Sequence, residues 1–167
     1  MKKRSITTGI TALLLLVLAT TAFAAPAGKA TPFKGSWDAS EIQNFSPAPP
    51  PDALTMHVDL DAWGNATHLG NYTAKFEAIV DVAGCSCSEG DTIHFIAANG
   101  DSLHGVGTAV GVSVPGKPGF HEVTHAFAIT GGTGRFVDAS GSFTLIRLVN
   151  LATRVSSGSF EGTVVLH

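Results

Sequence analysis

Apolar residues recur at every second position through most of the chain, and this pattern constrains the fold more than any other feature. In the segment LTMHVDLDA, one face of an extended strand would carry Leu54, Met56, Val58 and Leu60. Side chains alternate between the two faces of a β-strand, so a period of two predicts half-buried strands. Clusters of Gly, Asn, Asp and Pro separate the alternating segments, and after residue 24 no amphipathic helix is indicated. The sequence therefore predicts an all-β protein.

About eight strands are expected in a meander punctuated by glycine. They fall within residues 33–39, 54–62, 67–80, 92–110, 120–130, 140–150 and 157–166. The segment 92–110 reads as a hairpin, with Asn99 and Gly100 expected in a type I′ turn. Eight antiparallel strands can close into a barrel that is wide enough for packed side chains or one small ligand. We expect a calycin-like, eight-stranded antiparallel barrel, with an open β-sandwich as the alternative.

The N-terminus reads as a bacterial-type secretory signal peptide. A basic start, MKKR, precedes a leucine-rich run that is too short for a membrane anchor, and AFA supplies a cleavage site after Ala24. We expect a signal peptide over 1–24, a flexible mature N-terminus over 25–32 and a single domain over 33–167. The expected location is secreted or periplasmic, with no membrane span after cleavage.

The charge balance argues against two classes of partner. The whole chain has a net charge of −3, and its first 24 residues hold three of the ten basic residues and no acidic one. The mature chain is therefore more acidic still, and no basic patch is apparent. Nucleic acid and anionic membrane surfaces are not expected partners. The sequence does not indicate the oligomeric state.

The segment HEVTH, residues 121–125, matches the H-E-x-x-H pattern of zinc metalloproteases. That chemistry needs a helix, in which both histidines reach one metal ion. Here Pro and Gly precede the segment, β-formers fill it and GGTG ends it, so a strand is expected. On a strand the Cα atoms of His121 and His125 lie about 13 Å apart and Glu122 points to the opposite face. The metalloprotease interpretation is rejected, and no metal or cofactor is expected.

The same alternation places a few polar side chains among the apolar ones that should face the barrel interior. An apolar pocket with a few polar groups is typical of small-molecule sites. The alternative is that each of these residues is a hydrogen-bonded part of the core. The candidate lumen residues for ligand binding are His68, Tyr72, Phe76, His125, Phe127 and Arg147.

Cys85 and Cys87 are the only cysteines, and one residue separates them. Export would permit a disulfide, although a bridge across a single residue closes a tight ring. The expected state is such a bridge or two free thiols. Metal binding and a redox role are the less favoured alternatives.

Three motifs carry a resemblance to a known superfamily. GNATHLGNYT, AANGDSLHG and ITGGTGRFVDASGSF together span residues 64 to 143. They resemble small secreted bacterial proteins of the allene oxide cyclase and dirigent-like barrel superfamily. The resemblance implies an eight-stranded barrel with an internal cavity. In that superfamily, allene oxide cyclases cyclise a fatty-acid epoxide without a cofactor, and dirigent proteins steer the coupling of phenoxy radicals.

Three functions follow from these observations. The first is a secreted barrel that binds a small apolar molecule in its lumen without catalysis. The second is a cofactor-free cyclase or isomerase, in which His125 or Tyr72 acts as the acid or base. The third is a structural or interaction barrel filled by its own side chains. The catalytic residues of either superfamily branch cannot be transferred to this chain.

Overall fold

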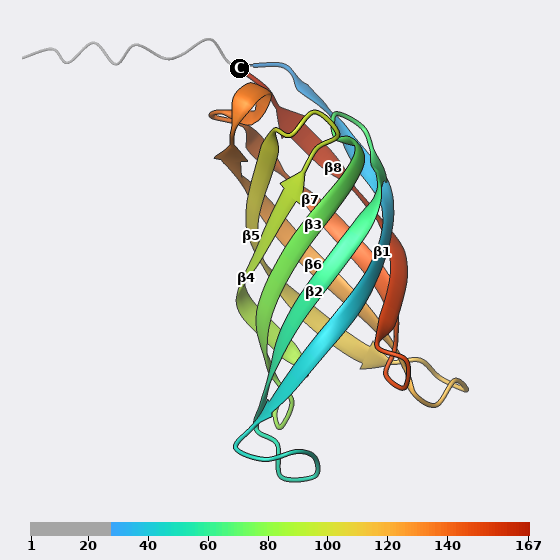
Figure 1. The fold of residues 1–167 in the computed structure, drawn as a ribbon. Coiled ribbons are helices and arrows are strands. Elements are labelled where there is room, and N and C mark those ends of the chain that lie inside the picture. Colours follow the sequence, from blue (N-terminus) through green and yellow to red (C-terminus); the bar gives the residue numbers. More distant parts are fainter. Residues whose placement is uncertain (1–27) are drawn as a thin grey trace, which may run out of the picture.

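The computed structural model describes residues 28–167, and the predicted signal peptide lies outside this range. Eight antiparallel strands form one closed barrel in which each strand pairs with its sequence neighbours and β1 pairs with β8 (Figure 1). The strands are β1 (Ala30–Ser46), β2 (Thr55–Ala66), β3 (Gly70–Asp81), β4 (Cys87–Ile96), β5 (Ser102–Ser113), β6 (Phe120–Gly132), β7 (Ser140–Asn150) and β8 (Val155–Val165). The predicted barrel is confirmed, and the β-sandwich alternative is wrong.

Side chains alternate in and out of the barrel along most of each strand, as the period of two predicts. In β6 the buried positions include His125, Phe127 and Ile129, and Glu122 is exposed. HEVTH is therefore on a strand, and the helix that a zinc protease requires is not present at this segment. Within the described residues, no helix is long and apolar enough to cross a membrane.

Aromatic rings fill one half of the barrel interior. Phe33 lies at the centre of this cluster, with its ring centroid 5.3 Å from Phe143 and 5.0 Å from Phe160. The edge-to-face and tilted arrangements of these rings are those that aromatic pairs prefer. At the nearby barrel end, a short 3-10 helix η1 (Gly134–Phe136) buries Phe136 completely (Figure 1). We call this cluster the aromatic core; it consists of Phe33, Tyr72, Phe95, Phe127, Phe143 and Phe160.

Two details of the backbone differ from the sequence predictions. Ala30 to Pro32 pair with the end of β8, so the barrel begins before the predicted boundary at residue 33 and these residues are not a flexible arm. The β4–β5 hairpin is present, but its turn is not type I′. Gly100 alone has a positive φ, of 88°, because the loop runs over 97–101 and closes with a bond from Gly100 N–H to the Ala97 carbonyl. Type I′ needs positive φ at Asn99 as well.

Candidate functional site

A pocket of about 510 Å³ opens at the barrel end opposite η1, and we call it the mouth pocket. This volume lies in the range of small-molecule sites. Its apolar lining comes from Phe45, Pro50, Pro51, Ala53, Met56, Val58, Val80, Val82, Val123, Val149 and Leu151. Its polar lining comes from Glu41, Gln43, Ser86, His121, Arg147 and Arg154.

The mouth pocket exists because the aromatic core fills only the other half of the barrel. Most of its lining residues lie near strand ends, beside the loops that connect β1 to β2, β3 to β4 and β7 to β8 (Figure 1). The Pro-rich loop at 47–54 contributes Pro50, Pro51 and Ala53 to one wall.

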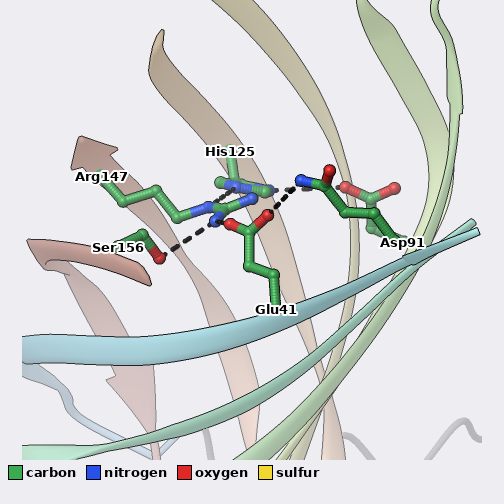
Figure 2. Close-up of polar contacts among 6 residues, drawn as sticks. Glu41, Asp91, His125, Arg147 and Ser156 are labelled. Carbon is green, nitrogen blue, oxygen red and sulfur yellow. Dashed lines mark hydrogen bonds and ion pairs between the residues drawn. The ribbon is translucent and has the colours of Figure 1, made fainter. Parts of the chain in front are cut away.

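A buried network of charged side chains forms the floor of the mouth pocket (Figure 2). Arg147 of β7 is its centre: Nη1 contacts the Glu41 carboxylate of β1 and donates to Ser156 Oγ of β8 at 3.1 Å. Arg147 Nε donates to His125 Nε2 of β6 at 3.0 Å. A planar guanidinium with several donors suits such a junction of several strands. The network therefore ties four strands together inside the barrel.

The bond from Arg147 fixes the protonation pattern of His125. Since Nε2 accepts the Arg147 Nε–H, its lone pair is engaged and the neutral ring carries its proton on Nδ1. That Nδ1 lies 3.5 Å from Asp91 Oδ2, so the ring is held between a cation and a carboxylate. His125 and Asp91 are both almost fully buried. A carboxylate beside Nδ1 orients the imidazole ring, as it does for a histidine that acts as a general base. In His125, however, the accepting nitrogen Nε2 faces Arg147.

Asp91 faces the interior because of a β-bulge. Gly90 has a positive φ of 73°, and the β4–β5 register shifts between Glu89 and Asp91. A bulge adds one residue to a strand. Ser88 and Asp91, three residues apart, therefore both point inward.

Three polar side chains near this bulge have buried atoms without a hydrogen-bond partner among the described residues. They are Ser88 Oγ, both Asp91 carboxylate oxygens and His125 Nδ1. A small void of about 30 Å³ is lined by Ser88, His125 and Arg147, and by the apolar side chains beneath the mouth pocket. Such a void has room for one small polar group, and buried polar atoms need a partner. The barrel floor is thus able to receive the polar end of a molecule that enters the pocket.

Burial lowers the pKa of His125, and the adjacent Arg147 cation lowers it further, although Asp91 opposes the shift. The unfolded chain takes up a proton on this histidine near pH 6.5, whereas the folded chain does so only at lower pH. The contribution of the neutral His125 to the free energy of unfolding is therefore fully present above pH 6.5, and it falls as the pH drops below this value.

We expect wild-type protein to lose up to about 1.4 kcal/mol of unfolding free energy per pH unit below pH 6.5 through this one proton. Urea denaturation between pH 7.5 and 5 measures the slope. The slope should be smaller in His125→Gln. Because the pKa of His94 is also lowered, by burial and by His104, the His94→Gln variant measures its separate share. An unchanged slope in His125→Gln would contradict the assignment.

The structure places the six predicted lumen residues in four different settings. Arg147 lines the mouth pocket, and His125 and Phe76 line the small void beneath it. Tyr72 and Phe127 belong to the aromatic core. Tyr72 donates its hydroxyl to the Ser36 carbonyl at 2.7 Å, and burial, with a contribution from Asp38, raises its pKa.

The prediction that His68 lies on the inner face of its strand is wrong. His68 is in the turn between β2 and β3, with a φ of 65°, and its ring contacts Thr31 Oγ1 at 3.2 Å. The turn interrupts the alternation, and Leu69 is the residue that is buried there. His68 is therefore at the opposite end of the barrel from the mouth pocket.

Sequence reasoning missed three members of the buried network, and the alternation itself could have found them. Glu41 lies on the same inward face of β1 as Trp37. Asp91 shares the inward face of β4 with Ile93, and Ser156 shares that of β8 with Phe160. All three residues lie one or two positions beyond the predicted strands 33–39, 92–110 and 157–166, and the structure extends each of these strands to include them.

Cys85 and Cys87 form a disulfide just before and at the start of β4. The bridge borders Ser86, a residue of the mouth pocket wall. Among residues 28–167, no group of three or more His, Cys, Asp and Glu side chains is arranged to hold a metal ion.

No family model and no curated protein matches the chain. Solved structures of similar shape include two pterocarpan synthase dirigent proteins, GePTS1 and PsPTS1. The GePTS1 structure has a TM-score of 0.57 and 16% sequence identity, and the match covers 93% of this chain and 99% of that chain. The PsPTS1 structure has a TM-score of 0.55 and 16% identity, with 86% and 99% covered. This chain shares the barrel fold of these two dirigent proteins.

At this identity the likeness shows the fold alone. The resemblance carried by the turn motifs is confirmed at that level: the dirigent-type barrel is closed, antiparallel and eight-stranded. The chemistry of this dirigent-type barrel must be argued from its own mouth pocket and buried network, because fold does not determine function.

Proposed function

We propose that the protein binds a small, largely apolar molecule in the mouth pocket, with one polar end of that molecule directed at the buried network. The observation that carries the proposal is the combination of a 510 Å³ apolar pocket with a charged floor. Apolar walls supply most of the binding free energy, and a few placed polar groups orient the ligand. Arg147 and Gln43 on the floor offer donors, and Glu41 offers acceptor oxygens.

The mouth pocket places the expected lumen ligand in one half of the barrel. The aromatic core occupies the half of the barrel near η1, so the ligand enters only the half near the Pro-rich loop. We also propose that residues 1–24 direct export and that binding takes place outside the cytoplasm. The disulfide between Cys85 and Cys87 is in keeping with an oxidising compartment.

A variant in which a larger side chain fills the mouth pocket tests the binding proposal. We expect wild-type protein to enhance the fluorescence of 1-anilinonaphthalene-8-sulfonate, an apolar dye with one anionic end. Val123→Phe places a ring in the mouth pocket and should abolish the enhancement. Thr124→Phe is the matched control, because Thr124 is the next residue of β6 and faces outward.

The same pair of variants is used in thermal melts with a panel of lipids and phenols. A ligand that binds the folded state raises the melting temperature. We expect a rise in wild type and in Thr124→Phe and none in Val123→Phe. Equal dye binding and equal melting shifts in all three proteins would contradict the proposal.

A cofactor-free isomerase or cyclase is the second candidate function. It is favoured by the grouping of Glu41, Arg147, His125 and Asp91 under an apolar pocket, since buried titratable side chains beside a pocket are candidates for acid–base chemistry. The two similar structures are of proteins named as synthases, so this barrel supports chemistry in other chains.

In the enzymatic candidate, Arg147 would stabilise a developing negative charge and Glu41 would transfer the proton. Tyr72 is an unsuitable acid or base because its hydroxyl is committed to Ser36 within the aromatic core. The test is turnover of unsaturated epoxides and phenolic substrates by wild type and Glu41→Gln. Turnover that is absent from wild type, or undiminished in Glu41→Gln, would count against this candidate.

A further inference from the structure

Two histidines face each other on the outer surface of the barrel, away from the mouth pocket. His94 of β4 lies directly opposite His104 of β5, and both side chains are exposed. Their ring centroids are 4.3 Å apart, with an angle of 84° between the ring planes. The pair is therefore a close cluster of two metal-ligating side chains that the proposed binding function does not use.

The position of the pair in the sheet explains why the rings are so close. The hairpin closes with a bond from Ala97 N–H to the Asp101 carbonyl at 2.8 Å. Hydrogen-bonded and non-hydrogen-bonded pairs alternate along an antiparallel ladder, which makes His94 and His104 a non-hydrogen-bonded pair. Side chains approach most closely at such pairs. Two nitrogens that share one metal ion must lie within about 4 Å of each other, which these facing rings can satisfy with a small rotation.

A chain of hydroxyl groups orients the His104 ring. His104 Nε2 lies 3.0 Å from Ser102 Oγ, and Ser102 Oγ lies 3.0 Å from Thr133 Oγ1. Ser102 is buried, and its contact with the exposed His104 ring is partly buried. Metal-binding histidines commonly donate their second ring N–H to such a partner, which fixes the tautomer. When Nε2–H donates to Ser102, the lone pair of His104 Nδ1 is free to bind an ion.

One basic side chain lies beside the pair on the sheet. Lys75 of β3 lies opposite His94, on the side of β4 away from His104. Its ammonium group is paired with Asp61 of β2. The ammonium group is therefore held toward Asp61, one strand further from the histidines.

We propose that His94 and His104 bind one divalent transition-metal ion, through one ring nitrogen each, with water in the remaining positions. Imidazole ligands suit copper, nickel and zinc, and Cu²⁺ is expected to bind more tightly than Zn²⁺. No third His, Cys, Asp or Glu completes the cluster within residues 28–167, so the ion is exchangeable and open to solvent. The site is independent of the mouth pocket.

Calorimetric titration of the full chain, made without a polyhistidine tag, with CuCl₂ and separately with ZnCl₂ tests this site. We expect one Cu²⁺ per chain with an EPR spectrum of two equatorial nitrogens, and weaker Zn²⁺ binding. Ser102→Ala should weaken Cu²⁺ binding by about tenfold, as the loss of an orienting partner does. His94→Gln and His104→Gln each remove a ligand and should weaken Cu²⁺ binding more than Ser102→Ala does.

His57→Gln is the control, because His57 is exposed on β2 and has no histidine opposite it in either neighbouring strand. It should bind Cu²⁺ as wild type does. Far-UV circular dichroism should be unchanged in every variant, since only Ser102 among these residues is buried. Lowering the pH to 5 should release the ion as the imidazoles take up protons. Equal Cu²⁺ binding by wild type and by the His94→Gln/His104→Gln double variant would overturn the proposal, as would no binding to wild type.

Discussion

Replacing Arg147 by methionine should lower the free energy of unfolding by about 3–5 kcal/mol, since removing one partner of a buried ion pair leaves its counter-charge unpaired. Arg147 and Glu41 are both buried, and the same guanidinium serves His125 and Ser156. The variant would therefore leave the Glu41 carboxylate without its cation inside the barrel. Urea denaturation at pH 7 measures the loss.

Two further variants separate the loss of charge from other effects. Arg154→Met removes an exposed arginine from the rim of the mouth pocket and should change stability by less than about 0.5 kcal/mol. The double variant Glu41→Leu/Arg147→Met removes the pair together and should recover part of the stability that Arg147→Met loses. A loss below about 1 kcal/mol in Arg147→Met would show that the network is solvated rather than buried.

Phe33→Ala should cost about 3–5 kcal/mol, the usual cost of deleting a buried phenylalanine ring. Phe33 is fully buried, and its ring packs against Phe95, Phe143 and Phe160 in the aromatic core. These neighbours belong to different strands, so they cannot easily collapse into the space that the ring leaves. The melting temperature and the urea midpoint should both fall.

Phe45→Ala is the comparison, because Phe45 is half-buried and lines the mouth pocket rather than the aromatic core. It should cost about 1 kcal/mol, as is typical for a substitution outside the core. Its larger effect should be on dye affinity, whereas Phe33→Ala should leave the affinity nearly unchanged at temperatures where it is folded. Equal stability losses in the two variants would contradict the division of the barrel into a filled half and an open half.

The fold could be predicted from the sequence because the period of two reports directly which side chains are buried. The alternation in 120–130 gave the inward face of β6 correctly, including His125 and Phe127. It failed at the turn between β2 and β3, where His68 has a positive φ and Leu69 is buried in its place. Such local irregularities depend on backbone conformation that an apolar pattern does not encode.

The candidate site was predictable only in part, because its floor is made of charged residues on inward positions. His125 and Arg147 were found, but their partners Glu41 and Asp91 were not. Burial of a charge is favourable only when the opposite charge is brought to it from another strand. That pairing depends on the strand order around the closed barrel, which only the structure supplies. The pocket's position, on one side of the aromatic core, likewise follows from three-dimensional packing.

The central claim is that small molecules enter the mouth pocket, and the methyl resonance of Met56 tests it most directly. Met1 and Met56 are the only methionines, and Met56 lines the pocket. In protein labelled with ¹³C at the methionine methyl group, titration with 1-anilinonaphthalene-8-sulfonate should shift the Met56 signal. The shift should saturate with the dissociation constant found by fluorescence and should disappear in Val123→Phe. Enhanced dye fluorescence with an unmoved Met56 resonance would contradict the account.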